Sequence, residues 1–385
     1  MNSSFPEPQR KLRINFFHRC IRIPNPIYPL QLNRYLKHQI SQQDKYDQLK
    51  LNNSTKAVVF ILPGKQVISG GILSIFTICE FTRTILSDYQ VLMVTEPGRF
   101  TYASLNWFSN QERIIRWELF INSFTNLSEL IIHIPEYLSN SFFDNISPND
   151  RTKLLKIPSL RINILNQNPQ LMPTPKAIEP LFKLTKKITQ TLAFKDKKIQ
   201  ELSNKYRMPI TTLLSYIDLT HWQPIPYELK SKRILLSPDI NNYSKRILKL
   251  LKLELPGYEV EVIHRMTFED YMRKVQDSFA VISLGEGYDG YLLQPAYVGT
   301  LSFAVYNDIF FPSKKFLRLR NVFSTYDQLL EDIVGRIVFF AAKKSNYYET
   351  IEQLKEMDKD HSKEELMSRL NAYYQEVYDC YPNRS

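Results

Sequence analysis

Cysteine and long apolar runs are both scarce in this chain of 385 residues. Its three cysteines, Cys20, Cys79 and Cys380, lie far apart and form no CxxC or Cys/His spacing, which argues against a disulfide framework and a structural zinc site. No stretch reaches the ~18 consecutive apolar residues that a transmembrane helix needs, and the N-terminus has no apolar signal-peptide core. We therefore expect a cytoplasmic protein in a reducing compartment.

Glycine is also rare, with 10 in the whole chain, whereas average usage of about 7% predicts more than twice as many. Two clusters stand out, at 64–71 and at 285–290. A chain so poor in glycine is expected to place it where the backbone turns sharply or approaches a ligand closely. Ordinary loop glycines are the alternative for either cluster.

Positive charge is abundant, since Lys+Arg number 50 against 39 Asp+Glu and give a net charge of +11. This balance favours an anionic partner: nucleic acid, a phosphorylated ligand or an anionic membrane face. Cations alternate with aromatic residues over 10–22, and lysines gather over 183–198. Such segments can dock on lipid headgroups, although plain surface solubility explains the lysine cluster equally well.

The rest of the pattern predicts an α/β protein. Short apolar runs that indicate buried strands alternate with segments of helical period, and this alternation is typical of doubly wound sheets. In the first half we expect strands at 57–62, 90–95, 130–134 and 160–165, with helices at 72–85, 107–121 and 176–187. In the second we expect strands at 233–237, 258–263, 279–283 and 301–306, with helices at 243–253, 267–276 and 290–298.

These elements predict two Rossmann-like domains, and a length of 385 residues suits two cores. The expected divisions are an N-terminal basic extension (1–54), a first domain (55–217), a Pro-bearing linker (218–231), a second domain (232–342) and a helical C-terminal tail (343–385). Ser362 and Glu365 fit a capping box that opens the last helix.

The first candidate site follows the first expected strand. Gly70 and Gly71 stand where a helix begins, and backbone N–H groups at such a place form an anion site that paired glycines let a phosphate approach. The segment 63–74 is neither GxGxxG nor GxxxxGK[ST], so a dinucleotide fingerprint and an ATPase P-loop are disfavoured.

The second candidate site is the segment 283–295. Glu286 lies between two glycines at the end of a strand, and Gln294 lies eight positions later. Because ligands of open α/β sheets bind at the carboxyl ends of strands, both side chains are expected to face one cleft as partners for sugar hydroxyls. The alternative is that Glu286 only caps the following helix.

This segment resembles the E-x7-E signature of retaining glycosyltransferases with two Rossmann-like domains (GT-B type), with Gln294 in the second acidic position. The likeness continues through 299–308 and includes Gly70 and Gly71 as the glycine-rich loop of the first domain. It covers about 55–345 and is strongest at 280–308. The implied fold is GT-B with a helical tail.

The resemblance implies roles for individual residues around a nucleotide-diphosphate sugar. Glu286 would face the hexose hydroxyls and Gln294 the ribose, where the family usually has a carboxylate. The amides of 287–290 would lie near the diphosphate, with those of Gly70 and Gly71 on its other side. The implied donor-binding set is Gly70, Gly71, Ser237, Arg246, His264, Gly285, Gly287, Tyr288, Asp289, Gly290 and Gln294.

The family also places a basic pair after the first strand of the second domain, to neutralise the leaving diphosphate. The Arg of that pair is missing at the strand end here, so Lys245 is the first candidate and Arg246 the second. A solvated helical face is the alternative for both. His264 lies where the family binds the base, and an ordinary loop residue is its alternative.

The expected function is therefore retaining hexosyl transfer from a nucleotide-diphosphate sugar to a saccharide or lipid-linked acceptor in cell-surface polysaccharide assembly. Glu286 and Lys245 would be the catalytic residues. No metal, other cofactor or nucleic acid is expected, and an anionic membrane surface at the inner face of the cell membrane is a possible partner. A nucleic-acid-binding protein and a non-catalytic scaffold of the same fold are the alternatives.

Overall fold

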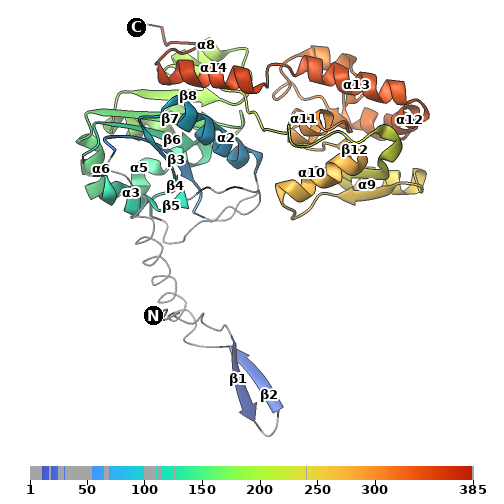
Figure 1. Cartoon of the computed structure of the whole chain (residues 1–385), viewed down its shortest axis with the longest axis horizontal. Helices are drawn as coiled ribbons and strands as arrows, with labels where there is room; N and C mark the ends of the chain where they lie inside the picture. Colours follow the sequence, from blue (N-terminus) through green and yellow to red (C-terminus); the bar gives the residue numbers. More distant parts are fainter. Residues whose placement is uncertain are drawn as a thin grey trace.

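The computed structural model describes residues 11–16, 19–24, 30, 54–64, 69–98, 110, 112, 114–124, 126–239 and 241–383. Most of the expected basic extension (1–54) lies outside these residues. Within it, β1 (Lys11–Phe16) and β2 (Arg19–Pro24) pair as an antiparallel ladder. The other described elements form two lobes, each built on its own parallel sheet (Figure 1).

The sheet of the first lobe has seven parallel strands in the order β5-β4-β3-β6-β7-β8-β9. Its central strands are continuous apolar runs, which are buried because helices cover both faces. The strands are β3 (Lys56–Leu62), β4 (Gln90–Thr95), β5 (Ile114–Ile115), β6 (Glu129–Pro135), β7 (Ser159–Asn166), β8 (Ile188–Leu192) and β9 (Ile210–Thr212). The helices are α2 (Gly70–Ile85), α3 (Trp117–Ser123), α4 (Glu136–Ser139), α5 (Phe142–Asn145), α6 (Pro148–Leu155), α7 (Pro175–Ile178), the 3-10 helix η1 (Glu179–Lys183) and α8 (Ile199–Tyr206).

Two helices expected in this lobe differ from the structure. The expected helix 107–121 lies partly outside the described residues. Within them, α3 begins at Trp117, because Ile114–Ile115 pairs with β4 as an edge strand. The expected helix 176–187 is the short α7 followed by η1. Strands β8 and β9 were not expected from the sequence. The reason is that β8 is buried along its whole length yet carries polar side chains, which accept hydrogen bonds from Asn163 and Asn166 of β7.

The sheet of the second lobe has five parallel strands in the order β11-β10-β12-β13-β14. They are β10 (Ser231–Leu236), β11 (Glu259–Val262), β12 (Ser278–Ile282), β13 (Leu301–Val305) and β14 (Val322–Phe323). Between them lie α9 (Ser244–Glu254), α10 (Phe268–Asp277), α11 (Gly290–Tyr297) and the 3-10 helix η3 (Lys314–Arg318), and α12 (Tyr326–Ala342) follows. The 3-10 helix η2 (Tyr227–Leu229) precedes β10. The predicted fold class, two doubly wound α/β domains, is confirmed.

The last two helices belong to different lobes. Helix α13 (Lys344–Met357) packs into the core of the second lobe through residues such as Tyr347 and Leu354. The chain then crosses back, and α14 (Lys363–Tyr374) packs against α2 and the first sheet through Leu370 and its neighbours (Figure 1). Ser362 caps α14 by accepting from the Glu365 amide at 3.1 Å, as the sequence predicts.

A buried polar network fixes α14 to the first sheet. The Tyr374 hydroxyl lies 3.1 Å from Nε2 of His133 on β6 and 2.8 Å from the Thr82 hydroxyl on α2. Burial lowers the pKa of His133 to about 3, so its imidazole is neutral in the folded protein. The short connection between α13 and α14 is thereby held at the boundary of the two lobes.

Among the described residues, no helix combines the length and apolar character that crossing a lipid bilayer requires.

Candidate functional site

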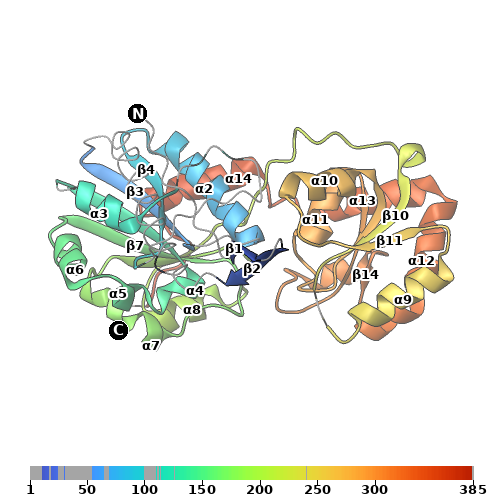
Figure 2. The same ribbon diagram turned by 90° about the horizontal axis from the view of Figure 1, so that it is seen from below.

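A cleft with a volume of about 1440 Å³ is lined by residues of both lobes. The two lobes lie side by side in Figure 2. The lining of the cleft comes from the start of α2 and the loops after β6 and β7 on one side, and from the loops after β10, β11 and β12 with α11 on the other. The connection between α13 and α14 also lines it. Carboxyl ends of parallel strands from both sheets thus meet at one cavity, the usual place for a ligand in open α/β folds.

Gly70 and Gly71, at the start of α2, line this cleft. Ser69 caps the helix, and its hydroxyl accepts from the Gly71 amide at 3.2 Å. A Cβ on Gly71 would lie 3.2 Å from Gln167 Cγ, whereas a Cβ on Gly70 would meet open space. The first turn of α2 therefore faces the cavity with little side-chain bulk, and a ligand can approach its backbone closely.

Glu286 lies on the opposite wall and connects the lobes. It follows β12, and Oε1 of its carboxylate accepts from Nδ2 of Asn168, which follows β7 of the first lobe. Burial raises the pKa of Glu286 to about 7, with further contributions from Asp289 and Asp239. A carboxyl group with a shifted pKa in a ligand-sized cleft is a candidate functional group.

Asp289 lines the cleft as well, but it serves the protein's own helix. Its carboxylate accepts from the Ser283 hydroxyl at 2.8 Å and from the Tyr291 and Leu292 amides at 2.8 and 3.1 Å, and so caps α11. Burial raises the pKa of Asp289 to about 6. The amides at this helix start already have a partner, which limits what they can offer a diphosphate.

Other residues of the predicted loop divide into two groups. Tyr288, Gly290 and Gln294 line the cleft, and so does His264 after β11. Gly285 and Gly287 lie outside the described lining. A Cβ on Gly285 would meet the Asp239 side chain at 2.6 Å. Gly287 has φ +85° with its Cβ position 2.3 Å from the Val305 carbonyl oxygen, so the turn itself requires a glycine at 287.

The three residues predicted near the β10 end are not in the described lining. Lys245 is exposed on α9, and Arg246 lies over the Tyr243 ring at 5.5 Å. Ser237 is buried, donates to the Asp239 carboxylate at 2.6 Å and accepts from the Leu284 amide at 2.8 Å. Ser237 therefore organises the loop after β12 and does not reach the cavity.

The structure adds cleft residues that the sequence did not single out. Glu136 directly follows β6, is 4% exposed, and has a carboxylate oxygen, Oε2, without a hydrogen-bond partner in the described part of the chain. Burial raises its pKa to about 7. Its position at the carboxyl end of a strand was a usable signal. Asp358 and His361, from the α13–α14 connection, gave no such signal.

The charges around the cavity are mixed. Five described lining residues are cationic, namely Lys195, Arg265, Lys355, Lys359 and Lys363. Six are acidic, namely Glu136, Asp239, Glu286, Asp289, Asp358 and Glu364. The described lining therefore carries nearly balanced charge. The described residues contain no group of three or more His, Cys, Asp and Glu side chains arranged to hold a metal ion.

No protein-family model matches the sequence, and no curated protein matches it significantly. Solved structures do match. An alpha-glucosyltransferase in complex with UDP and a 13-mer DNA aligns with a TM-score of 0.55 and 9% identity, over 83% of this chain and 99% of that one.

Sucrose-phosphate synthase from Thermosynechococcus elongatus aligns with the same TM-score of 0.55 and 9% identity, over 84% of this chain and 99% of that one. At this identity the likeness concerns the fold alone, and the aligned 84% of this chain includes residues of both lobes. The chain has the GT-B fold that the sequence predicted.

Proposed function

We propose that this protein is a glycosyltransferase that binds a nucleotide-diphosphate sugar in the cleft between its lobes. It would transfer the hexose, with retention of configuration, to a saccharide or lipid-linked acceptor. One observation carries the proposal: Gly70 and Gly71 of the first lobe line the same cleft as Glu286 and Gln294 of the second, within a GT-B fold.

In this proposal the second lobe holds the donor. Glu286 accepts hydrogen bonds from hexose hydroxyls, and Gln294 serves the ribose. The start of α2 faces the diphosphate, although its Gly71 amide already donates to the Ser69 hydroxyl. Because Lys245 and Arg246 lie outside the described lining, the positive charge opposite the leaving group comes from cleft residues such as Arg265 after β11. Catalysis then rests on positioning and on fixed charges.

The mixed charge of the cleft bears on the nucleic-acid alternative. A groove that tracks a polynucleotide carries an excess of cations, but here the described lining has slightly more acidic than basic side chains. The net charge of +11 is therefore carried elsewhere, where it suits a protein that works against an anionic membrane face. We accordingly propose cell-surface polysaccharide or glycoconjugate assembly as the setting.

Titration calorimetry tests the proposal. UDP, GDP, ADP and CMP are titrated first, and one nucleotide diphosphate is expected to bind. The matching nucleotide sugar is then titrated into the wild type and into Glu286→Gln. The variant should bind the sugar nucleotide more weakly while binding the free nucleotide as before, because Glu286 is assigned to the hexose alone. Absence of heat with every nucleotide would favour a non-catalytic scaffold.

A further inference from the structure

A cluster of titratable side chains lies where the chain crosses between the lobes. The carboxylate of Asp358, at the end of α13, is 1% exposed. It accepts from the Tyr288 hydroxyl at 2.5 Å and from the Tyr297 hydroxyl at 2.9 Å, and Nδ1 of His361 lies 2.7 Å from it. A buried carboxylate with three donors has a fixed position.

The geometry fixes the tautomer of His361. Because Asp358 can only accept, the short contact requires a proton on Nδ1. The Tyr288 hydroxyl, 3.5 Å from Nδ1, donates to the same carboxylate, and burial next to Asp358 raises the pKa of Tyr288 well above its usual range. In the neutral imidazole Nε2 then carries the free lone pair.

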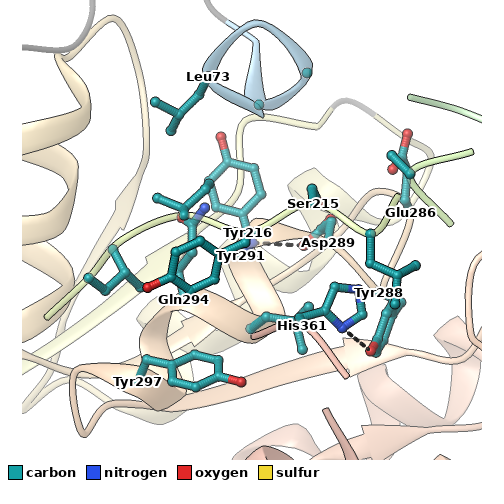
Figure 3. Close-up of a pocket in the computed structure, with 18 of the residues that line it drawn as sticks. Leu73, Ser215, Tyr216, Glu286, Tyr288, Asp289, Tyr291, Gln294, Tyr297 and His361 are labelled. Atoms are coloured by element: carbon teal, nitrogen blue, oxygen red, sulfur yellow. Dashed lines mark hydrogen bonds between the residues drawn. The ribbon is translucent and has the colours of Figure 1, made fainter. Parts of the chain in front are cut away.

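His361 lines the cleft, on the wall that also carries Tyr288 and Glu286 (Figure 3). Its side chain is 12% exposed, whereas that of Asp358, which also lines the cleft, is 1% exposed and lies against Nδ1 of the ring. An imidazole held by a buried carboxylate, with its second nitrogen available at a ligand cavity, is the usual arrangement of a general base.

We propose that His361 is the catalytic base that takes the proton of the attacking acceptor hydroxyl, with Asp358 as its positioning residue. This assignment rests on the proposed glycosyl transfer. As the acceptor oxygen bonds to the anomeric carbon, the bond from that carbon to the diphosphate oxygen breaks and its electron pair leaves with the nucleotide diphosphate. The acceptor proton passes to Nε2 and is later returned to solvent. The assignment holds for attack from either face of the sugar, because the acceptor oxygen loses its proton in both.

Several charged and titratable groups surround the imidazole. Asp358 and Asp360 flank it in the chain, and Asp360 is paired with Lys195 from the first lobe. Tyr288 faces it from the loop after β12. Three other charged neighbours in the chain line the same cleft, namely Lys359, Lys363 and Glu364.

The first test reads the tautomer in the free protein and needs no substrate. In ¹⁵N-histidine NMR spectra, the His361 signals are assigned by their loss in His361→Gln. The neutral ring is expected to carry its proton on Nδ1, and Asp358→Asn should abolish that preference. A wild-type ring protonated on Nε2 would overturn the assignment whether or not the protein transfers sugar.

The second test measures donor hydrolysis, in which water replaces the unknown acceptor. Nucleotide release from UDP-glucose, GDP-mannose and ADP-glucose is followed from pH 5 to 9. His361→Ala should lower kcat by about 10²–10⁴-fold, remove the loss of activity at low pH that protonation of the base causes, and regain activity with added imidazole. His221→Ala is the matched control, because His221 is exposed and lies outside the described cleft lining.

The outcomes separate the two proposals. If the wild type binds no nucleotide and hydrolyses no donor, the proposed function fails, and the NMR result alone decides whether the Asp358–His361 pair is built as inferred. If the wild type is active but His361→Ala keeps the wild-type pH profile and gains no activity from imidazole, the inference is wrong. His361 would then only stabilise the connection between α13 and α14.

Discussion

The segments that follow β12 and β10, two neighbouring strands of the second lobe, place their predicted catalytic residues differently. The loop after β12 places Glu286 in the cleft, whereas the segment after β10 leaves Lys245 outside its described lining. Glu286 precedes its helix and stands on the loop at the strand end. Lys245 lies inside α9, where the burial of Ile247 and Leu251 decides the orientation of the helix and turns Lys245 to solvent. The position of a residue on the loop is set by the end of the strand before it. The direction of a side chain in the helix is set by which face of the helix is apolar and buried.

Among the variants that test this comparison, the largest effect is expected from Glu286→Ala. Removing the carboxylate should lower kcat for donor turnover by about 10²–10³-fold, because the hexose loses its hydrogen-bond acceptor. Turnover and thermal unfolding are measured together, with Glu286→Gln as the variant that keeps an oxygen toward Asn168. Wild-type turnover in the alanine variant would show that Glu286 does not contact the donor. Glu286 and Lys245 would then not differ in function.

Gly287→Ala tests the turn that supports Glu286. At φ +85°, with the Val305 oxygen 2.3 Å from a Cβ, any side chain forces the backbone to move. We expect a loss of about 2–4 kcal/mol in the free energy of unfolding, measured by urea denaturation. Gly70→Ala is the matched control, because a Cβ there meets nothing within 4 Å. Equal stability of the two variants would contradict the described turn.

Glu136 is a buried carboxyl group at a strand end of the first lobe, as Glu286 is in the second, and the pH dependence of stability tests it. Burial raises its pKa from 4.5 to about 7, so between these values the folded protein binds more protons than the unfolded chain. Stability then falls as pH rises through this window and levels off above it. Glu136→Gln should reduce that fall by about 1–3 kcal/mol, judged from urea unfolding at pH 5 and pH 8. An unchanged difference between the two pH values would show that the buried carboxyl is not responsible.

The smallest effect is expected from Lys245→Ala and Arg246→Ala. Both side chains are exposed outside the described cleft lining, so donor turnover should change by less than about twofold and stability by less than about 0.5 kcal/mol. Arg265→Ala, which removes a cation that lines the cleft, serves as the positive comparison. A large loss of activity in Lys245→Ala with no effect of Arg265→Ala would restore the sequence-based assignment.

Much of the fold was predictable because it depends on local pattern. Apolar runs such as 57–62 mark buried strands wherever they occur, and glycines at 285–290 mark a tight turn. Strand β8 was missed because its polar side chains are satisfied by partners on β7, namely Asn163 and Asn166, and no local pattern reports such partners. Glu286 was selected because it lies at the end of an expected strand. The same reasoning could have selected Glu136, which directly follows β6.

By itself the sequence determined the α/β alternation, the two-lobed architecture and the loop that carries Glu286, because period and turn chemistry act over a few neighbouring residues. Only the tertiary structure decided that α13 and α14 pack on different lobes, that the residues between them reach the cleft, and that Lys245 does not. These outcomes depend on which sheet each apolar helix face covers. That choice is made between segments far apart in the chain, as when Tyr374 meets His133.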